Sequence, residues 1–520
     1  MKMNLFNSIQ LQKPKKSVFD LSHDVKMSGD MGNLIPVLAL DTVPGDKFNL
    51  SCESIVRFAP LLAPIMHRVD VSIHYFFVPN RILWPNWEKF ISEAGDTIVA
   101  PYLNYNNSYT TYNKFLDYFG VPPQSTALQT KINALPFAAY QCIYNEYYRD
   151  QNLVTAVDYK LTDGNNSVTG TQIANLLTLR KRAWEHDYFT ASLPFAQKGP
   201  AVDIPLGDVV LKTDWELNLN GKFPAFQNQL DQAQNTGAIS ASSDLYNSVA
   251  TPSISNGATN PTNKPLVYNP NGSLETQPTT INELRRAFKL QEWLERNARG
   301  GTRYVENILA HFGVKSSDAR LQRPEYITGV KTPVVISEVL NTTGTTGQLP
   351  QGNMAGHGIS VTGGKYGNYY CEEHGWIIGI MSVMPKTAYQ QGLPKMFQKL
   401  DNLDYFWPSF ANIGEQAVQE SEIFIDSTTP TAVFGYVPRY AEYKYMPSRV
   451  AGDFRTTLDY WHLGRKFATK PVLNQTFIEC DPAVTKRIFA VTSTQDSLYC
   501  HIYHKIMAVR PMPKFGTPSF

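Results

Sequence analysis

The sequence predicts a mainly β protein, an antiparallel sandwich whose strands are joined by long loops that contain helices. Three observations favour this class. Apolar residues recur with a period of two in segments near both ends of the chain. A section of helical periodicity divides these segments, and a polar section without any period follows it. Tyr and Phe, which favour strands, number 28 and 27 among the 520 residues.

The chain begins with a polar arm that precedes two strands. Residues 1–16 end in KPKK and are predicted to form a flexible basic arm. The two strands are predicted because alternate positions share a mostly apolar face. These positions are Phe48, Leu50, Cys52, Ser54 and Val56, and then Val69, Val71, Ile73, Tyr75 and Phe77. Pro79 ends the second strand, since proline lacks the N–H that a ladder requires.

Residues 85–200 follow a mostly helical pattern. Two predicted helices are each closed by a glycine. They contain Trp87, Phe90, Ile91 and Ala94, closed by Gly95, and Tyr112, Phe115, Leu116 and Phe119, closed by Gly120. Further helices are expected near 137–149 and 171–184. A strand is expected at 208–219, where Val209, Leu211, Trp215, Leu217 and Leu219 lie on one face.

Segment 221–280 differs in kind from the rest of the chain. Asn, Gln, Ser, Thr, Gly and Pro fill 37 of its 60 positions, and only five residues are charged. No period survives over more than a few residues. These features predict a polar surface insertion and not a core element.

Two helices are predicted over residues 281–313. Thr280 and Glu283 have the spacing of a capping box. The first helix has a broad apolar face from Leu284 to Ala298, and Gly300 with Gly301 breaks it. The second ends at Gly313. The face opposite the apolar one carries Arg285, Lys289, Arg296 and Arg299.

Alternation returns from about residue 333 to the end of the chain. Strands are predicted at 375–384, 431–446, 454–463, 486–493 and 497–509. Residues 17–520 are therefore expected to form one sandwich domain, with helical loop insertions at 85–200 and 281–313.

Composition excludes several function classes. The formal net charge is +2, so global charge does not point to nucleic acid. Charged residues make up only 18 % of the chain, which suits a subunit that buries much of its surface against neighbours. The most apolar run, 376–384, is too short to span a bilayer. We therefore expect a soluble, unexported chain. Five widely spaced cysteines argue against a disulfide framework and for a reducing compartment.

Catalytic and metal-binding interpretations find little support. In Cys371-Glu372-Glu373-His374, neighbours on a strand would point to opposite faces, so the four side chains would not converge. His501 and His504 have the same odd separation. Asp401 and Asp404 could share a helix face, but such pairs are usually solvated. GxGxxG, GxxxxGK[ST], HExxH and GxSxG are absent. We expect no enzyme, no cofactor and no metal.

Two basic features have alternative interpretations. Lys13, Lys15 and Lys16 could neutralise phosphates or form a solvated tail. The arginines of the helical segment and of MPSRVAGDFR could bind subunits or, less favoured, phosphate. These arginines are Arg285, Arg299, Arg303, Arg449 and Arg455.

Long strings of the sequence resemble one protein family, in order. They include SVFDLSHDVKMSGDMGNLIPV, RFAPLLAPIMHRVDVSIHYFFVPNRILW, HDYFTASLPFAQKG, ARGGTRYVENILAHFGVKSSDARLQRPEYITG, GIMSVMPKTAYQQGLPKMF and YAEYKYMPSRVAGDFR. These resemble the major capsid proteins of the Microviridae, most closely the gokushovirus-like branch. The resemblance begins near residue 17, continues into the C-terminal region, and is weak or absent across 221–280.

The resemblance implies a fold and a set of partners. It implies an eight-stranded antiparallel jelly-roll barrel, subunits in a T=1 icosahedral shell, and circular single-stranded DNA inside. In that branch an insertion builds protrusions at the three-fold axes, and 221–280 lies where it would be. Further implied partners are a small DNA-binding protein, a pilot protein and a host surface receptor, with assembly in the bacterial cytoplasm and residence in the virion.

Two other classes were weighed against a capsid subunit. The aromatic content and strand count also fit a β-sandwich that binds or cleaves carbohydrate, although cleavage needs two positioned carboxylates. A phage attachment protein would differ from a capsid subunit mainly in copy number. The sequence favours the capsid subunit, and sugar contact by 221–280 is one hypothesis for its role.

Overall fold

A computed structural model of the chain describes most of the sequence, and residues 199–294 form a compact unit separate from the rest. Side chains are described for residues 15–92, 98–104, 107–110, 112–123, 131–204, 280–342, 344, 351–364, 366–425, 431–491 and 494–515. Between 205 and 279 the description is limited to the backbone of four short strands.

The first of two principal sheets has seven strands. Its centre is the pair β19 and β4, which run antiparallel from Leu498–Phe58 to Val509–Lys47. β1 and β2 pair with successive parts of β19, while β14 and β15 pair with opposite ends of β4, and β13 forms the edge beyond β14. The strands are β1 (Ser17–Asp20), β2 (His23–Gly29), β4 (Lys47–Phe58), β13 (Val335–Leu340), β14 (Met354–Thr362), β15 (Gly367–Tyr370) and β19 (Leu498–Arg510).

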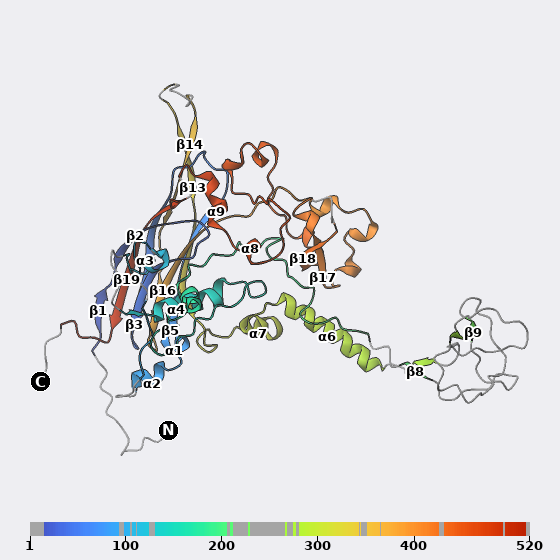
Figure 1. The fold of residues 1–520 in the computed structure, drawn as a ribbon, viewed down its shortest axis with the longest axis horizontal. Coiled ribbons are helices and arrows are strands. Elements are labelled where there is room, and N and C mark those ends of the chain that lie inside the picture. The colour runs from blue at the N-terminus through green and yellow to red at the C-terminus, as the bar shows by residue number, and fades with distance from the viewer. Residues whose placement is uncertain are drawn as a thin grey trace, which may run out of the picture. The chain divides into compact units, whose positions relative to one another are not determined.

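The second sheet has four antiparallel strands in the order β12-β5-β16-β3. Its strands are β3 (Ile35–Thr42), β5 (Val69–Pro79), β12 (Glu325–Pro333) and β16 (Gly375–Pro385). Figure 1 shows the strands of both sheets running alongside one another. Within the described ranges, the ladders of the two sheets do not join into a closed barrel, so the predicted barrel is not found.

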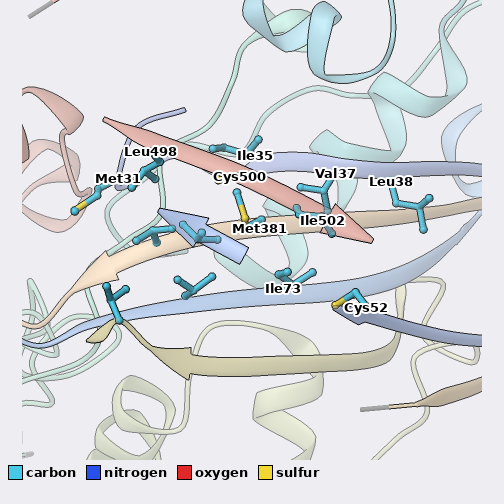
Figure 2. Packing of buried hydrophobic residues seen from close by; sticks show 14 of the residues in the cluster. Met31, Ile35, Val37, Leu38, Cys52, Ile73, Met381, Leu498, Cys500 and Ile502 are labelled. Atoms are coloured by element: carbon cyan, nitrogen blue, oxygen red, sulfur yellow. The ribbon is translucent and has the colours of Figure 1, made fainter. Parts of the chain in front are cut away.

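The main core lies between the two sheets. Ile73 and Met381 from the four-stranded sheet pack in one cluster with Leu498 and Ile502 from the seven-stranded sheet (Figure 2). The predicted alternation in β4 is confirmed, because Phe48, Leu50, Cys52, Ser54 and Val56 are all at most 3 % exposed.

β5 is buried on both faces, although its first half alternates between apolar and polar residues. Ile73 and Phe77 face the core between the sheets, whereas Phe76 and Val78 pack in a second cluster with helix α4 (Leu135–Ile143). Polar side chains are accommodated on the covered second face where they have partners, as Asp70 has in Lys331 and Lys386, both at 3.2 Å.

The helical section contains less helix than predicted. Its helices are α1 (Asn80–Leu83), α2 (Trp87–Ser92), α3 (Lys114–Tyr118), α4, the π-helical turn η1 (Tyr144–Tyr148) and α5 (Gly170–Leu177). A two-stranded ladder joins β6 (Tyr102–Leu103) to β7 (Ile132–Asn133). The predicted closure of the first helix at Gly95 lies outside the described residues. The helix predicted at 171–184 ends at Leu177, because the following backbone pairs with other segments. Arg180 O accepts from Leu34 N–H, and Arg182 O accepts from Cys480 N–H.

The unit of residues 199–294 holds two short ladders, β8 (Val209–Leu211) with β11 (Leu274–Thr276) and β9 (Gln227–Asn228) with β10 (Leu266–Val267). β8 covers the start of the predicted strand 208–219, and the remainder lies outside the described residues. Most of the predicted insertion 221–280 also lies outside them.

The two predicted helices after the insertion are confirmed as α6 (Ile281–Arg299) and α7 (Tyr304–Phe312). The capping box is present, because Thr280 N–H donates to Glu283 Oε2 at 3.0 Å and Glu283 N–H donates to Thr280 Oγ1 at 3.3 Å. Gly313 ends α7 in the left-handed conformation, with φ of 66°.

The C-terminal third is less regular than predicted. The strands at 375–384 and 497–509 are confirmed as β16 and β19, and 431–446 contains β18 (Val433–Pro438), paired with β17 (Glu415–Gln419). The remaining short elements are η2 (Lys395–Phe397), η3 (Asn402–Asp404), η4 (Pro408–Phe410), η5 (Glu420–Glu422), η6 (Ala441–Tyr443), η7 (Gly452–Arg455), η8 (Asp459–Trp461), α8 (Gln475–Ile478), α9 (Pro482–Thr485) and η9 (Lys486–Ile488).

The strands predicted at 454–463 and 486–493 are wrong. In the first segment the chain forms turns, and Arg487 donates to the carbonyl oxygens of Asp459, His462 and Gly464. The described part of the second segment pairs instead with residues 60–62, because Leu62 N–H donates to Ile488 O at 2.9 Å and Ala490 N–H donates to Pro60 O at 2.8 Å. These distant partners bond to the backbone without a regular strand ladder.

Candidate functional site

The strongest metal-like cluster of the sequence does not assemble. Cys371 to His374 follow β15 in a turn and not in a strand, so the predicted reason for their divergence is wrong, although they still diverge. Cys371 is fully buried, and Glu373 instead forms two hydrogen bonds with Arg81, at 2.7 and 2.9 Å. Among the residues that the structure describes, no three His, Cys, Asp or Glu side chains could hold one metal ion.

The two histidines of β19 lie on opposite faces, as predicted. His501 is exposed and contacts Asp24 Oδ1 at 2.9 Å. His504 is fully buried, where Nδ1 lies 2.9 Å from the Tyr75 hydroxyl and Nε2 lies 3.0 Å from Val37 O. Burial lowers the pKa of His504 to about 4, so this ring is neutral and structural at pH 7.

Asp401 and Asp404 are not a catalytic pair. The Asp404 carboxylate accepts the N–H groups of Leu400 and Asp401, each at 2.9 Å, and so closes a turn. These two bonds lower the pKa of Asp404, which favours a charged capping group and not a general acid.

All five cysteines are free and buried. Burial raises the pKa of Cys142, Cys371, Cys480 and Cys500 to about 12. Because the thiolate is the reactive form, these cysteines are inert core residues.

The predicted basic patch is divided. Lys13 lies outside the described residues, and Lys15 is exposed. Lys16 Nζ donates to Gly45 O at 2.8 Å and lies 5.6 Å from the centre of the Tyr370 ring. Lys16 therefore fastens the start of β1 to the neighbouring loop.

The five candidate arginines do not form one patch. Arg299 pairs with Glu415, and Arg303 pairs with Glu306 at 3.0 Å and donates to Arg149 O. Arg285, Arg449 and Arg455 are exposed. Arg455 also donates to Val450 O at 3.2 Å. The structure thus gives Arg299, Arg303 and Arg455 partners within the chain, and Arg455 remains exposed together with Arg285 and Arg449.

A cavity of about 600 Å³ lies beside Arg303. Its lining includes Arg149, Arg303 and Gln151, and the Gln151 carboxamide oxygen can accept from both arginines at 3.1 Å. Its carboxylates Asp150 and Asp187 accept backbone N–H groups of their own turns. These groups hold loops together, and they do not form a nucleophile with an activating base.

One feature was missed by sequence reasoning. Residues 400–409 are all exposed, and they include five large apolar side chains. The string LDNLDYFW was the available signal, because it is rich in apolar residues that follow neither helical nor strand spacing. Hydrophobic periodicity detects the face of an element that packs on a core, and these side chains do not pack on a core.

The architecture and the side-chain placement define a class of protein. A two-sheet sandwich with long loops, polar groups paired within the chain and exposed apolar loops is the build of a structural assembly protein. Within the described residues, no helix is long and apolar enough to cross a membrane.

Comparison with known proteins identifies the family. The family model described as "Capsid protein (F protein)" matches residues 7–520. The chain therefore belongs to this phage capsid protein family, which makes it a major capsid protein and a structural component of the virion. The resemblance seen in the sequence is thereby confirmed.

Three relatives match over nearly their whole length. Capsid protein VP1 of Bdellovibrio phage phiMH2K is 36 % identical, with 97 % of this chain and 95 % of the relative covered. VP1 of Chlamydia phage 1 is 33 % identical, with coverage of 99 % and 97 %. VP1 of Spiroplasma virus 4 is 30 % identical, with coverage of 97 % and 95 %. Capsid protein F of Escherichia phage alpha3 matches over 26 % of this chain.

Proposed function

We propose that the chain is the repeating subunit of a small T=1 icosahedral shell that encloses a circular single-stranded DNA genome. The capsid family match over residues 7–520 carries this proposal. In a closed shell many modest contacts between copies add up, so stability comes from the assembly and not from one contact. Assembly would take place in the bacterial cytoplasm.

The strand order supports a jelly roll as the framework of this subunit. Eight strands form two facing sets, β2-β19-β4-β14 and β3-β16-β5-β12. In chain order these eight strands are β2, β3, β4, β5, β12, β14, β16 and β19. Each of them is followed by a strand of the other sheet, except that β5 is followed by β12 of its own sheet. Repeated crossing between two packed antiparallel sheets is the property of a jelly roll.

Residues 221–280 are proposed to form surface protrusions at the three-fold axes and to contact the host. Their amide and hydroxyl groups and low charge suit contact with a sugar or another surface polymer. The long connection between β5 and β12 contains them, so they can extend without altering either sheet.

The basic arm is proposed to contact the genome on the inner face, by neutralising phosphates without reading sequence. Arg285, Arg449 and Arg455 are exposed and are available for a subunit or phosphate contact. A small DNA-binding protein, a pilot protein and a host receptor complete the proposed set of partners.

Electron microscopy of the purified chain tests the shell. We expect isometric particles, or pentameric building blocks that convert to particles as protein concentration and salt are varied. Particles from infected cells should contain about 60 copies of this chain, the number that a T=1 shell requires. Stable monomers under every assembly condition would contradict the proposal.

A further inference from the structure

The loop between β16 and β17 displays an unusual apolar surface. Residues 400–409 are the longest uninterrupted run of exposed residues in the described ranges. We call residues 400–407 the aromatic loop. Its Leu400 side chain is 94 % exposed, and Leu403, Tyr405, Phe406 and Trp407 are each about half exposed. A buried aromatic side chain covers about 150–250 Å², so these five residues present on the order of 400 Å² of apolar surface.

The aromatic loop is held in one shape by its own hydrogen bonds. The Asp404 carboxylate accepts two N–H groups at the start of the loop, from Leu400 and Asp401. At its end, the Trp407 indole donates to Asn402 O at 2.9 Å. The exposed apolar side chains therefore belong to a closed turn.

The loop is also anchored to the body of the subunit through residues 440–443. Lys399 Nζ lies 3.2 Å from Glu442 Oε1 and 3.7 Å from the centre of the Tyr443 ring. Both charged side chains are less than 10 % exposed. The Phe406 ring packs on the Tyr440 ring, with centres 5.0 Å apart.

Tyr440 itself adopts a conformation that the backbone disfavours. Its φ is 60°, in the left-handed region that non-glycine residues rarely adopt. Gln416 Oε1 holds it by accepting its N–H at 2.9 Å. Surroundings that enforce such a conformation keep the support of the aromatic loop rigid.

We propose that the aromatic loop is a contact between two copies of this chain in the shell, an inference that rests on the proposed function. A preformed apolar surface binds with little further loss of conformational entropy. A standard interface buries about 800 Å² per partner, so the loop supplies roughly half of one. Tyr443, Tyr445 and Met446, at 55 %, 60 % and 80 % exposed, extend the apolar surface nearby.

Charge favours a second copy over nucleic acid as the occupant. Single-stranded DNA binds aromatic platforms that are lined with cations. Within the aromatic loop the only charged residues are Asp401 and Asp404, and both are acidic. The nearest lysine in sequence, Lys399, is buried against Glu442. At residues 400–407 a phosphate backbone would meet two carboxylates, and the exposed cation Lys444 lies outside this loop, between Tyr443 and Tyr445. The apolar side chains of another subunit meet no such repulsion at the loop.

Replacement of Leu400 tests the contact with little risk to the fold. Leu400→Lys places a charge on a side chain that contributes almost nothing to the subunit core. We expect unchanged circular dichroism and thermal midpoint of the subunit, and at least a tenfold lower yield of particles in sedimentation. Leu400→Met keeps the apolar contact and should assemble normally. Val168→Lys, at an exposed apolar position outside the loop, is the matched control and should also assemble.

A photo-cross-linker identifies the occupant. p-Benzoyl-phenylalanine at position 400 should yield a covalent product of twice the subunit mass, with both peptides from this chain. Cross-links to DNA alone or to another virion protein alone, or full assembly of Leu400→Lys, would overturn the proposal. Failure of the shell proposal and failure of the loop contact give different results. If the wild-type chain forms no particle, the shell proposal is wrong. If, in addition, the chain with the cross-linker at position 400 gives no covalent dimer at high protein concentration, the loop contact is wrong as well.

Discussion

At the scale of single residues, two buried charged side chains have partners of different kinds inside the chain. Glu415, with a side chain 1 % exposed, pairs with Arg299, whose side chain is half exposed. Removing one partner of a fully buried pair typically costs about 3–5 kcal/mol, and solvent around Arg299 makes the cost smaller here. Arg465 is 9 % exposed, and it donates to Phe477 O and lies 4.0 Å from the centre of the Phe477 ring. These residues therefore serve the fold first.

The same reasoning separates the three lysines of the N-terminal arm. Lys13→Ala with Lys15→Ala should weaken binding of single-stranded DNA and lower the DNA content of particles. Each lost phosphate contact should reduce the slope of log affinity against log salt by about 0.7, so the double variant should lose about 1.4. Binding isotherms at several salt concentrations measure the change in DNA affinity. The ratio of ultraviolet absorbance by nucleic acid to that by protein measures the DNA content of the particles.

Lys16→Ala is the matched control for the arm. Because Lys16 bonds to Gly45 O, Lys16→Ala should lower the thermal midpoint of the subunit. The slope of log DNA affinity against log salt should stay at the wild-type value. An unchanged slope and unchanged DNA content in the double variant would refute a DNA role for the arm.

At the scale of elements, one connection between two strands of the same sheet contains most of the helices. The segment from β5 to β12 contains helices α1 to α7 and the separate unit of residues 199–294. Lengthening a loop whose ends are fixed costs little free energy, about 0.6 kcal/mol per doubling. The sheets thus tolerate a large insertion at this one place.

Deletion of residues 221–280, with a short Gly-Ser linker in their place, tests their assignment. Since β5 and β12 keep their antiparallel partners, we expect the sheets to fold with a thermal midpoint near that of the wild type. Particles should form but should adsorb poorly to host cells in a binding assay. Recovery of only aggregated chain would show that the segment belongs to the core, and normal adsorption would remove its proposed role.

At the scale of the whole molecule, histidines in both sheets and the loops between them link stability to pH. Burial lowers the pKa of His67, His74 and His504 to about 4. The unfolded chain takes up protons near pH 6.5, whereas the folded chain does so only near pH 4. The stability is therefore complete above pH 6.5 and is lost as pH falls from 6.5 toward 4.

His504→Gln isolates one of these contributions, because glutamine offers a donor and an acceptor but does not titrate. The loss of unfolding free energy between pH 7.5 and 5.0, measured by urea denaturation of unassembled subunits, should be smaller than in the wild type by roughly 2 kcal/mol. An equal pH dependence in His504→Gln and the wild type would contradict the assignment. Burial raises the pKa of Glu422 and acts in the opposite direction, so the comparison of variants is the informative measurement.

Local signals predicted some of the regular elements and missed others. The alternation in β4 and the capping box at Thr280 depend on neighbours in sequence, and both are present. The segments 454–463 and 486–493 were predicted as strands because their apolar spacing looked similar. In the first segment Arg487, which lies 23 to 28 residues away in sequence, bonds to three carbonyls in place of a partner strand. Hydrophobic periodicity does not reveal a contact between residues so far apart in sequence.

The sequence by itself determined the class of this protein: a β-rich subunit without a catalytic motif, in a phage capsid family, with a polar insertion after its helical section. Those properties follow from composition, local periodicity and long matching strings. Only the tertiary structure decided which charges are paired within the chain and which apolar side chains remain uncovered. Both depend on contacts between residues far apart in sequence, such as Arg299 with Glu415 or Phe406 with Tyr440. The order of residues along the chain does not by itself reveal such distances.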